Sequence, residues 1–347
     1  MPHPARPTVT LHQVAAAAGV SVATASRVLN GSARKVAPEY EARVLAAAAA
    51  LRYTTDASAR AMRRAGDAIA LVADDLTTPS MGMIVAAMER HARGAGALVT
   101  VSSTMGAPER QLDTVRVLRS LRPRALVLTS STFAAGPLDE RLSEELRSYE
   151  RQGGRVVIVG ETCPDFDSVG LDNHGAGHAA GAHLAGTGHR RVVVLAGEGR
   201  RVNMAARTAG CVEGLVSGGL DPRDIRTVPC PVSRQGGFDA ARALTAEGLS
   251  GWEAIACVND IIAIGAMAAL RAAGLDVPGD LSVTGIDDIP LASDVTPRLT
   301  TVALPLALAG TEAIRLALSE AGGGGRRGLL LAGHLVPGAS TRARPAR

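Results

Sequence analysis

Aromatic residues and lysine are scarce in this 347-residue chain. Phe, Tyr and Trp together make up 2% of it, and a single lysine, Lys35, stands against 36 arginines. Because 46% of the residues are nevertheless hydrophobic, the interior must be built mainly from Ala, Val, Leu and Ile. A chain of this length and apolar content can bury a sizeable core and form more than one domain.

Long apolar runs and paired cysteines are missing as well. The chain has no stretch of about 18 apolar residues that would span a membrane, and its first ten residues, MPHPARPTVT, lack the apolar segment of a secretory signal. We therefore expect a cytoplasmic protein without a membrane partner. The four cysteines stand singly, without CxxC spacing, which predicts buried reduced thiols.

Charge is unevenly distributed along the chain. Residues 1–66 hold nine basic and three acidic residues, a net charge of +6, whereas residues 67–347 carry a net charge of −2. A small basic head on a large, nearly neutral body indicates that the head meets a polyanion.

Two short helical patterns separated by a glycine open the basic head. Thr10 is a suitable cap for a helix over residues 11–18, Gly19 supplies a turn, and Ser21 is a suitable cap for a second helix over residues 22 to about 29. This pattern predicts a helix-turn-helix, whose second helix enters the DNA major groove. The alternative is an alanine-rich core hairpin that touches no DNA.

The second helix has side chains suited to DNA. Ser21 and the free backbone amides at its start can meet a phosphate, while the small Val22 and Ala23 can approach thymine methyl groups. Arg27 can reach a phosphate or a guanine. A third helix, expected from about Pro38, braces the pair.

Residues 53–64, YTTDASARAMRR, predict a short hinge helix with an apolar tip and flanking arginines. Such a helix is too short to persist alone in water. It suits a wedge that opens a base step in the minor groove. A basic linker without defined structure is the alternative.

The stretch VTLHQVAAAAGVSVATASRVLNGSARKVAPEYEARVLAAAAALRY resembles the headpiece of the LacI-type (LacI/GalR) repressor family. The resemblance implies one set of residues that hold phosphates and another that reads bases, with Met62 as the minor-groove wedge. The implied phosphate contacts are Thr10, Ser21, Thr24, Ser26 and Asn30, and the implied base contacts are Val22, Ala23 and Arg27.

From Ala68 onward, short β-branched runs such as RVVIVG and RVVVLAG alternate with amphipathic helical stretches. This βαβ rhythm predicts parallel sheets. The strands are too many for one comfortable sheet, so we expect two lobes with a ligand between them, at the carboxyl ends of the strands. The segments VGLDNHGAGHAAGAHLAGTGHRRVVVLAG and AIACVNDIIAIGAMAALRAAG are similar to the periplasmic-binding-protein-like effector domain of the same repressors.

This second resemblance implies a set of cleft residues whose donors and acceptors can grip the hydroxyls of a sugar. The implied effector-binding residues are Asp74, Ser80, Asp172, Arg207, Asn259 and Asp287. Asn259 has the alternative role of a helix cap, and Asp287 that of a turn residue. Met81, Val232 and Leu304 stand where relatives place aromatic or glutamine side chains, so the cleft is expected to be less polar and its ligand need not be a sugar.

The predicted fold class is an α-helical helix-turn-helix headpiece plus an α/β periplasmic-binding-protein-like effector domain of two parallel-sheet lobes. The headpiece is expected over 8–53, the hinge over 54–66 and the effector domain over 67–342. The first lobe is expected to comprise 67–164 and 304–320, and the second 165–303 and 327–342.

Two patterns suggest other chemistry. GAGHAAG, residues 175–181, fits a dinucleotide fingerprint, but the preceding Asp172 and Asn173 are plausible caps, so its glycines are expected inside a helix, where they allow close packing. His174 and His178 have zinc-like spacing without a glutamate base or a third ligand. We therefore expect no catalytic residue, no metal site and no cofactor.

The sequence thus predicts a sequence-specific transcription regulator that acts as a repressor. It would bind a pseudo-palindromic DNA operator as a homodimer under the control of a small-molecule effector, a carbohydrate or a related metabolite. The rival functions are an NAD(P)-binding oxidoreductase and a non-regulatory solute-binding protein.

Overall fold

The computed structural model describes residues 9–30, 36–51, 53, 68–105, 107–129, 137–198, 201–320 and 325–344. The chain forms two compact units, residues 1–66 and residues 67–347. The described helices include none that is long and apolar enough to cross a bilayer.

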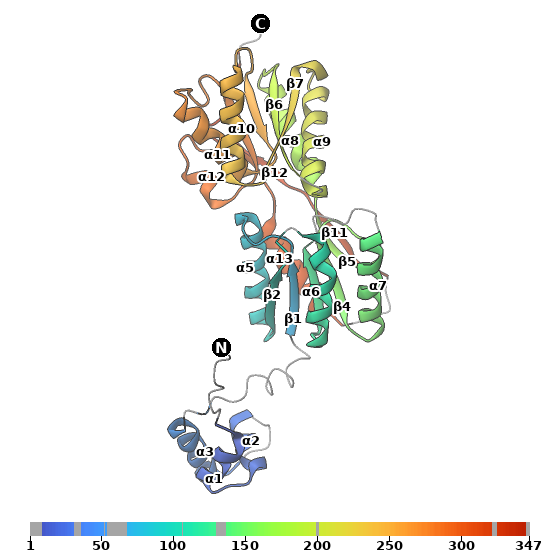
Figure 1. The fold of residues 1–347 in the computed structure, drawn as a ribbon, viewed down its shortest axis with the longest axis vertical. Helices are drawn as coiled ribbons and strands as arrows, with labels where there is room; N and C mark the ends of the chain where they lie inside the picture. Colours follow the sequence, from blue (N-terminus) through green and yellow to red (C-terminus); the bar gives the residue numbers. More distant parts are fainter. Residues whose placement is uncertain are drawn as a thin grey trace, which may run out of the picture. The chain divides into compact units, whose positions relative to one another are not determined.

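The first unit is a bundle of three short helices (Figure 1), and its local signals act as predicted. Thr10 and Gln13 form a reciprocal capping box at the start of the first helix, and Gly19 ends that helix in the left-handed conformation, at φ 61°. Pro38 occupies the first turn of the third helix. The helices are α1 (Leu11–Ala18), α2 (Val22–Asn30) and α3 (Pro38–Ala50).

Small side chains form the core of the first unit. Each helix contributes valine or alanine, and Ala25 of α2 is fully buried. Because alanine side chains are short, the helices approach closely around this centre. The buried set is Val14, Ala15, Ala18, Ala25, Val44 and Ala48.

The second unit contains two six-stranded sheets. The first has the strand order β11-β5-β4-β3-β1-β2, and all its pairings are parallel. Its strands are β1 (Ala68–Ala73), β2 (Leu98–Ser103), β3 (Ala125–Thr129), β4 (Arg155–Gly160), β5 (Asp167–Leu171) and β11 (Gly328–Leu331).

The second sheet has the strand order β12-β10-β9-β8-β6-β7, and only β12 runs antiparallel to its neighbour among the described pairings. Its strands are β6 (Val192–Gly197), β7 (Ile225–Cys230), β8 (Ala254–Cys257), β9 (Ser282–Asp287), β10 (Thr300–Ala303) and β12 (His334–Val336).

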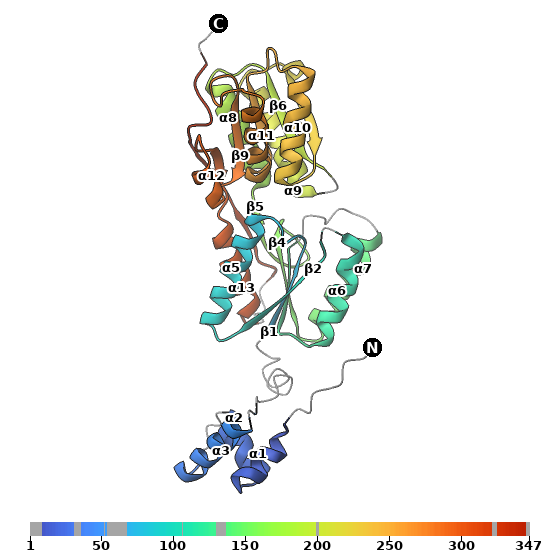
Figure 2. The ribbon, with the colours of Figure 1, turned by 60° about the vertical axis from the view of Figure 1, so that its left-hand side comes forward.

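Helices cover both faces of each sheet. Figure 2 shows α5 and α13 on one face of the first sheet and α6 and α7 on the other. In Figure 1, α8 and α9 flank one face of the second sheet, and α10 and α11 flank the other. The helices are α5 (Pro79–Gly94), α6 (Pro108–Ser120), α7 (Pro137–Arg151), α8 (Asn173–Gly186), α9 (Val202–Ser217), α10 (Arg234–Glu247), α11 (Asp260–Ala272), α12 (Pro290–Asp294) and α13 (Leu306–Leu318).

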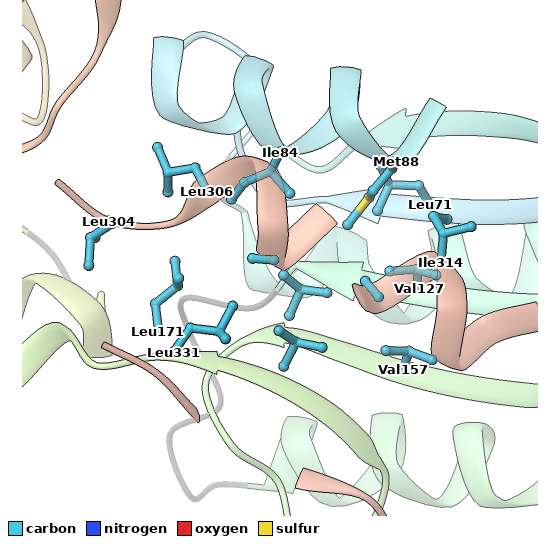
Figure 3. Packing of buried hydrophobic residues seen from close by; sticks show 14 of the residues in the cluster. Leu71, Ile84, Met88, Val127, Val157, Leu171, Leu304, Leu306, Ile314 and Leu331 are labelled. Atoms are coloured by element: carbon cyan, nitrogen blue, oxygen red, sulfur yellow. The ribbon is translucent and has the colours of Figure 1, made fainter. Parts of the chain in front are cut away.

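Aliphatic side chains fill the space between each sheet and its helices. Figure 3 shows this packing in the first lobe, where Leu71 and Val127 of the sheet lie beside Met88 of α5 and Ile314 of α13. These side chains are buried, as expected for a core built mainly from aliphatic residues.

The lobe boundaries differ from the prediction. Strands β5 and β11 were expected in the second lobe, but they pair with each other in the first sheet, Gly328–Leu331 alongside Ser168–Leu171. Short apolar runs identify strands but do not specify their partners. The described chain crosses between the lobes at three places: after β5, between β10 and α13, and between β11 and β12.

Candidate functional sites

The first candidate site is the start of α2. The Ser21 hydroxyl accepts a hydrogen bond from the Thr24 backbone N–H (3.1 Å) and lies 2.9 Å from Thr24 Oγ1. This bond is the helix cap that the sequence predicts. It fixes both hydroxyls at the end of the helix where unpaired backbone amides attract anions.

The predicted DNA-contacting residues differ in exposure. Ala23 and Arg27 are exposed on α2, whereas Val22, Thr24 and Ser26 are half-buried. Thr10 is exposed, and its side chain is held in the capping box of α1. Asn30 is the last residue of α2. Its side chain and the hinge residue Met62 lie outside the described residues, as does the whole predicted hinge.

The second candidate site is a cavity between the two lobes, where strands of both sheets end. Its volume is about 80 Å³. Binding sites in open α/β sheets lie at the carboxyl ends of the strands, and this cavity has that position. The polar lining residues are Asp74, Asp75, Thr78, Ser80, Thr129, Asn173, Arg201, Asn203, Arg207, Asn259 and Asp287.

Arg207 is the centre of the polar network. From the buried face of α9, its Nε donates to Asn173 Oδ1 (2.9 Å), and its Nη1 donates to the carbonyl oxygen of Val258 (3.0 Å). The same Nη1 lies 2.9 Å from Asp287 Oδ1, and both side chains of this ion pair are 4% exposed. The guanidinium is therefore buried and held by three partners.

Asp287 ends strand β9 in a strained conformation, at φ 126°, and Asp288 follows at φ 55°. Asp287 is thus both the turn residue and the cleft residue that the sequence offered as alternatives. Burial raises the pKa of Asp287, while the Arg207 guanidinium and a hydrogen bond from Ser80 oppose the rise. No described group donates a well-directed hydrogen bond to Asp287 Oδ1 despite its nearness to Arg207.

Asp260 adds a further buried carboxyl group beside Asp287. It accepts hydrogen bonds from the Ile289 backbone N–H and the Thr301 hydroxyl. Burial and then the negative charge of Asp287 raise the pKa of Asp260 to about 7. The sequence pattern did not single this residue out, because its partners lie 29 and 41 positions away in the chain.

Asn259 also has both roles that the sequence allowed. Its Oδ1 caps α11 by accepting a hydrogen bond from the Ile262 N–H (3.0 Å), and its buried side chain lines the cavity. Asp74 and Ser80 line the cavity from the first lobe. Four predicted cleft residues and Asn259 therefore meet in one place.

Asp172 does not line the cavity. It is the N-cap of α8, where it accepts a hydrogen bond from the Gly175 N–H (2.8 Å). The next residue, Asn173, is the one that faces the cleft and binds Arg207. Both side chains are plausible caps in sequence, and the rotation of α8 decides between them.

The cavity also has apolar walls. Met81 and Val232 line it as the sequence predicted, together with Ile84, Val159, Leu171, Met204 and Leu306. The described lining residues include no aromatic side chain. Leu304 lies instead in the core of the first lobe, with 5% of its surface exposed (Figure 3). The leucine that stands where relatives have glutamine therefore does not change the lining of this cavity.

The glycines of GAGHAAG lie inside α8 and pack against α9, as predicted. A Cβ added at Gly177 would come within 2.0 Å of the Arg207 carbonyl oxygen, and one at Gly181 within 2.2 Å of the Cys211 carbonyl oxygen. These glycines are therefore needed for helix contact, which removes the reason to read them as a dinucleotide fingerprint. His174 pairs with Glu213 at 3.1 Å on the exposed surface of the same helices.

Fold and sites together define a class of protein: a helix-turn-helix unit joined in one chain to a two-lobed α/β unit with a polar cleft. Residues 10–56 match the family of bacterial regulatory proteins, lacI family, and residues 182–341 match the periplasmic binding protein-like domain. The chain belongs to the LacI family of bacterial transcription regulators.

Individual relatives agree over nearly the whole length. The chain is 31% identical to the transcriptional regulator GalR of Escherichia coli over 90% of this chain and 89% of that protein. It is 32% identical to GalS of Salmonella typhimurium over 91% of each. The crystal structure of the lac repressor dimer bound to operator and the anti-inducer ONPF has a TM-score of 0.77 and 27% identity, covering 97% of this chain and 100% of that one.

These findings confirm the predicted fold class and the predicted function as a DNA-binding transcription regulator.

Proposed function

We propose that this regulator is a repressor that acts in the cytoplasm. It binds a pseudo-palindromic operator as a homodimer, and a small polar ligand in the interlobe cavity changes its affinity for that operator. The cavity binds this ligand without transforming it, and no cofactor takes part.

The exposed face of α2 supports the proposal that this helix contacts DNA. Ala23 and Arg27 project from it, and the capped hydroxyls of Ser21 and Thr24 lie at its start. A small residue permits close approach to base edges, and an arginine pairs with guanine or phosphate. In this proposal Thr10, Ser26 and Asn30 add phosphate contacts, Val22 touches a base, and Met62 is the minor-groove wedge.

One observation carries the proposal for the ligand: a fixed guanidinium and a buried carboxylate, those of Arg207 and Asp287, line one cavity. Arg207 is held by Asn173 and Asp287, and Asp287 Oδ1 remains without a well-directed donor among the described groups. A ligand hydroxyl can donate to the Asp287 carboxylate, and Asn259 and Ser80 line the same cavity and can add further bonds. Hydrogen bonds to charged groups are stronger than those between neutral groups, so such a ligand gains affinity from Arg207 and Asp287.

The class of ligand follows from charge and shape. Three aspartates and two arginines line the cavity, and neutral polar and apolar side chains form the rest of its wall. This lining favours an uncharged, hydroxyl-bearing molecule over a phosphorylated one. A solved structure of the regulator CelR in complex with cellobiose, 27% identical to this chain with a TM-score of 0.67, supports a carbohydrate.

Dimerisation is supported by apolar surface at one edge of the first lobe. Strand β2 is an edge strand of its sheet, and Leu98 at its start is 68% exposed. Val117 and Leu121 at the end of α6 are 64% and 61% exposed. Exposed apolar side chains that gather in a contiguous patch are typical of protein interfaces. Two-fold symmetry of the protein then matches two-fold symmetry of the operator.

Selection of binding sites from random duplex DNA tests the proposal. The expected product is an inverted repeat bound about 10³-fold or more tightly than random competitor at physiological salt. Recovery of no preferred sequence would contradict the proposal. Titration of cellobiose against the selected complex then tests the ligand class.

Arg27→Ala tests the role of α2 on the selected operator. Because a base-reading arginine is worth about 1–3 kcal/mol, affinity should fall by about 5- to 150-fold per half-site. Fluorescence anisotropy measures the change. Arg223→Ala, which removes an exposed arginine from the second unit, is the charge-matched control and should leave affinity unchanged. Normal binding by Arg27→Ala would show that this residue reads no DNA.

A further inference from the structure

An ion pair between two residues that line the cavity connects the two lobes. Asp75 follows β1 in the first lobe, and Arg201 precedes α9 in the second. Arg201 Nη2 lies 3.3 Å from Asp75 Oδ2, and the two side chains are 23% and 18% exposed. Neither residue was singled out in the sequence, because 126 positions separate them.

Contacts within the first lobe hold the Asp75 carboxylate in the orientation that the ion pair needs. Its Oδ1 accepts hydrogen bonds from the Thr77 backbone N–H (2.8 Å) and the Thr77 hydroxyl (2.6 Å). Oδ2 is left to face the second lobe. Burial raises the pKa of Asp75, but the hydrogen bonds from Thr77 and the contact with Arg201 lower it by more, so the carboxylate stays charged.

The Arg207–Asp287 pair does not hold the lobes together in this way. Arg207 lies on α9 and Asp287 ends β9, so both belong to the second lobe. The contact of Ser80 with Asp287 does cross the cleft, but it joins a neutral hydroxyl to the carboxylate. The Asp75–Arg201 contact therefore supplies a charged link between the lobes.

The cavity between the lobes is too small to admit a sugar-sized ligand as it stands. At about 80 Å³ the cavity is well below the roughly 300–1,000 Å³ of sites that hold small-molecule ligands. Asp75 and Arg201 are themselves lining residues. A hydroxylated ligand of sugar size can enter only if the lobes separate, and separation breaks this ion pair.

We propose that Asp75 and Arg201 form an interlobe latch that sets how often the cleft opens to ligand. This inference rests on the ligand control proposed above. A cleft that opens more readily has a higher apparent affinity for its ligand, because a larger fraction of the protein is in the form that can bind. A partly exposed ion pair is weak, so the latch biases the opening equilibrium without locking it.

The rate of thiol labelling in the cleft measures the opening. Met204 lines the cavity with 6% of its surface exposed, so Met204→Cys provides a thiol that reagent reaches mainly through the open form. Cys163→Ser removes the half-buried native thiol. Burial raises the pKa of Cys211 to about 12 and that of Cys230 to about 11, and Cys257 is fully buried, so the other thiols react slowly.

In this background Asp75→Asn and Arg201→Gln should each raise the rate of labelling by the reagent DTNB by about two- to fivefold. The double variant should show the increase of one single variant rather than the product of both, since the pair can be broken only once. Unchanged rates in both single variants, or multiplied rates in the double variant, would overturn the proposal.

Two controls separate the latch from local disturbance. Thr77→Val removes one of the two donors that orient Asp75 but keeps the backbone donor and the ion pair, so it should raise the rate much less than Asp75→Asn does. An increase equal to that of Asp75→Asn would assign the effect to the turn and overturn the latch. Asp224→Asn breaks the Arg191–Asp224 pair, which has the same 3.3 Å length but lies within the second lobe, and it should have no effect.

The assay uses the full chain and contains neither DNA nor ligand. Failure of operator selection would therefore contradict the proposed function and leave the latch standing. Unchanged labelling would contradict the latch and leave the proposed function standing.

Discussion

Arg207 and Asp287 depend on each other because each would otherwise be an unpaired charge in the buried centre of the second unit. Their side chains are 4% exposed, and the ion pair is 2.9 Å long. Removing one partner of such a pair typically costs about 3–5 kcal/mol, whereas replacing both is far less harmful. At the residue scale, this pair therefore has a structural role beside its proposed role in ligand binding.

Arg207→Met should lower the free energy of unfolding of the second unit by about 3–5 kcal/mol at pH 8, measured by urea denaturation. The loss should be smaller at pH 5. Burial already raises the pKa of Asp287, and without Arg207 to lower it the carboxyl takes up a proton as the pH falls and becomes neutral in the folded state.

Adding Asp287→Asn to Arg207→Met is the matched control. The double variant should recover most of the lost stability at pH 8 and lose the difference between pH 5 and pH 8. A single variant as stable as the parent protein would contradict this account of the pair.

At the scale of elements, the contact between α8 and α9 determines where Arg207 lies. Glycines on each helix face the backbone of the other: a Cβ at Gly177 would meet the Arg207 carbonyl oxygen at 2.0 Å, and one at Gly210 would meet the His174 carbonyl oxygen at the same distance. Backbone atoms cannot rotate away as a flexible side chain can. Any added atom must therefore separate the two helices.

Gly177→Ala should destabilise the second unit by about 1–3 kcal/mol in urea denaturation, because overpacking forces the helices apart. Gly186→Ala is the control on the same helix. A Cβ there would meet no atom within 4 Å, so the usual preference of helices for alanine should leave stability unchanged or raise it by up to about 1 kcal/mol. Equal effects of the two substitutions would contradict the packing argument.

Local signals made the headpiece predictable from sequence. Thr10, Gly19 and Ser21 act on the backbone within three or four residues, so the pattern of caps and turn gave the helices almost to the residue. The same local reasoning reached the glycines of α8, because their spacing within a helix does not depend on distant strands.

Long-range geometry explains what the sequence did not reveal. The choice between Asp172 and Asn173 depends on the rotation of α8, and the assignment of β5 and β11 depends on their pairing with each other. Asp75 and Arg201 meet only because two lobes close on each other. Patterns in a single sequence do not contain such information, although the family resemblance correctly brought Arg207, Asn259 and Asp287 to one cavity.

At the scale of the whole molecule, each chain has one basic DNA-binding unit, and two chains related by two-fold symmetry are needed to recognise an operator. The net charge of +6 on residues 1–66 supplies general attraction to DNA, but it does not distinguish sequences. A single helix-turn-helix makes few base contacts. Sequence preference strong enough for regulation therefore requires two chains on two half-sites.

The affinity of the full chain for a selected inverted repeat, compared with the same repeat carrying one scrambled half-site, tests this central claim most directly. Anisotropy titrations at physiological salt should give two chains per intact repeat, and scrambling one half-site should weaken binding by at least about 100-fold, since each mismatched base pair costs about 1–3 kcal/mol. Equal affinity for the two duplexes, or one chain per intact repeat, would contradict the account.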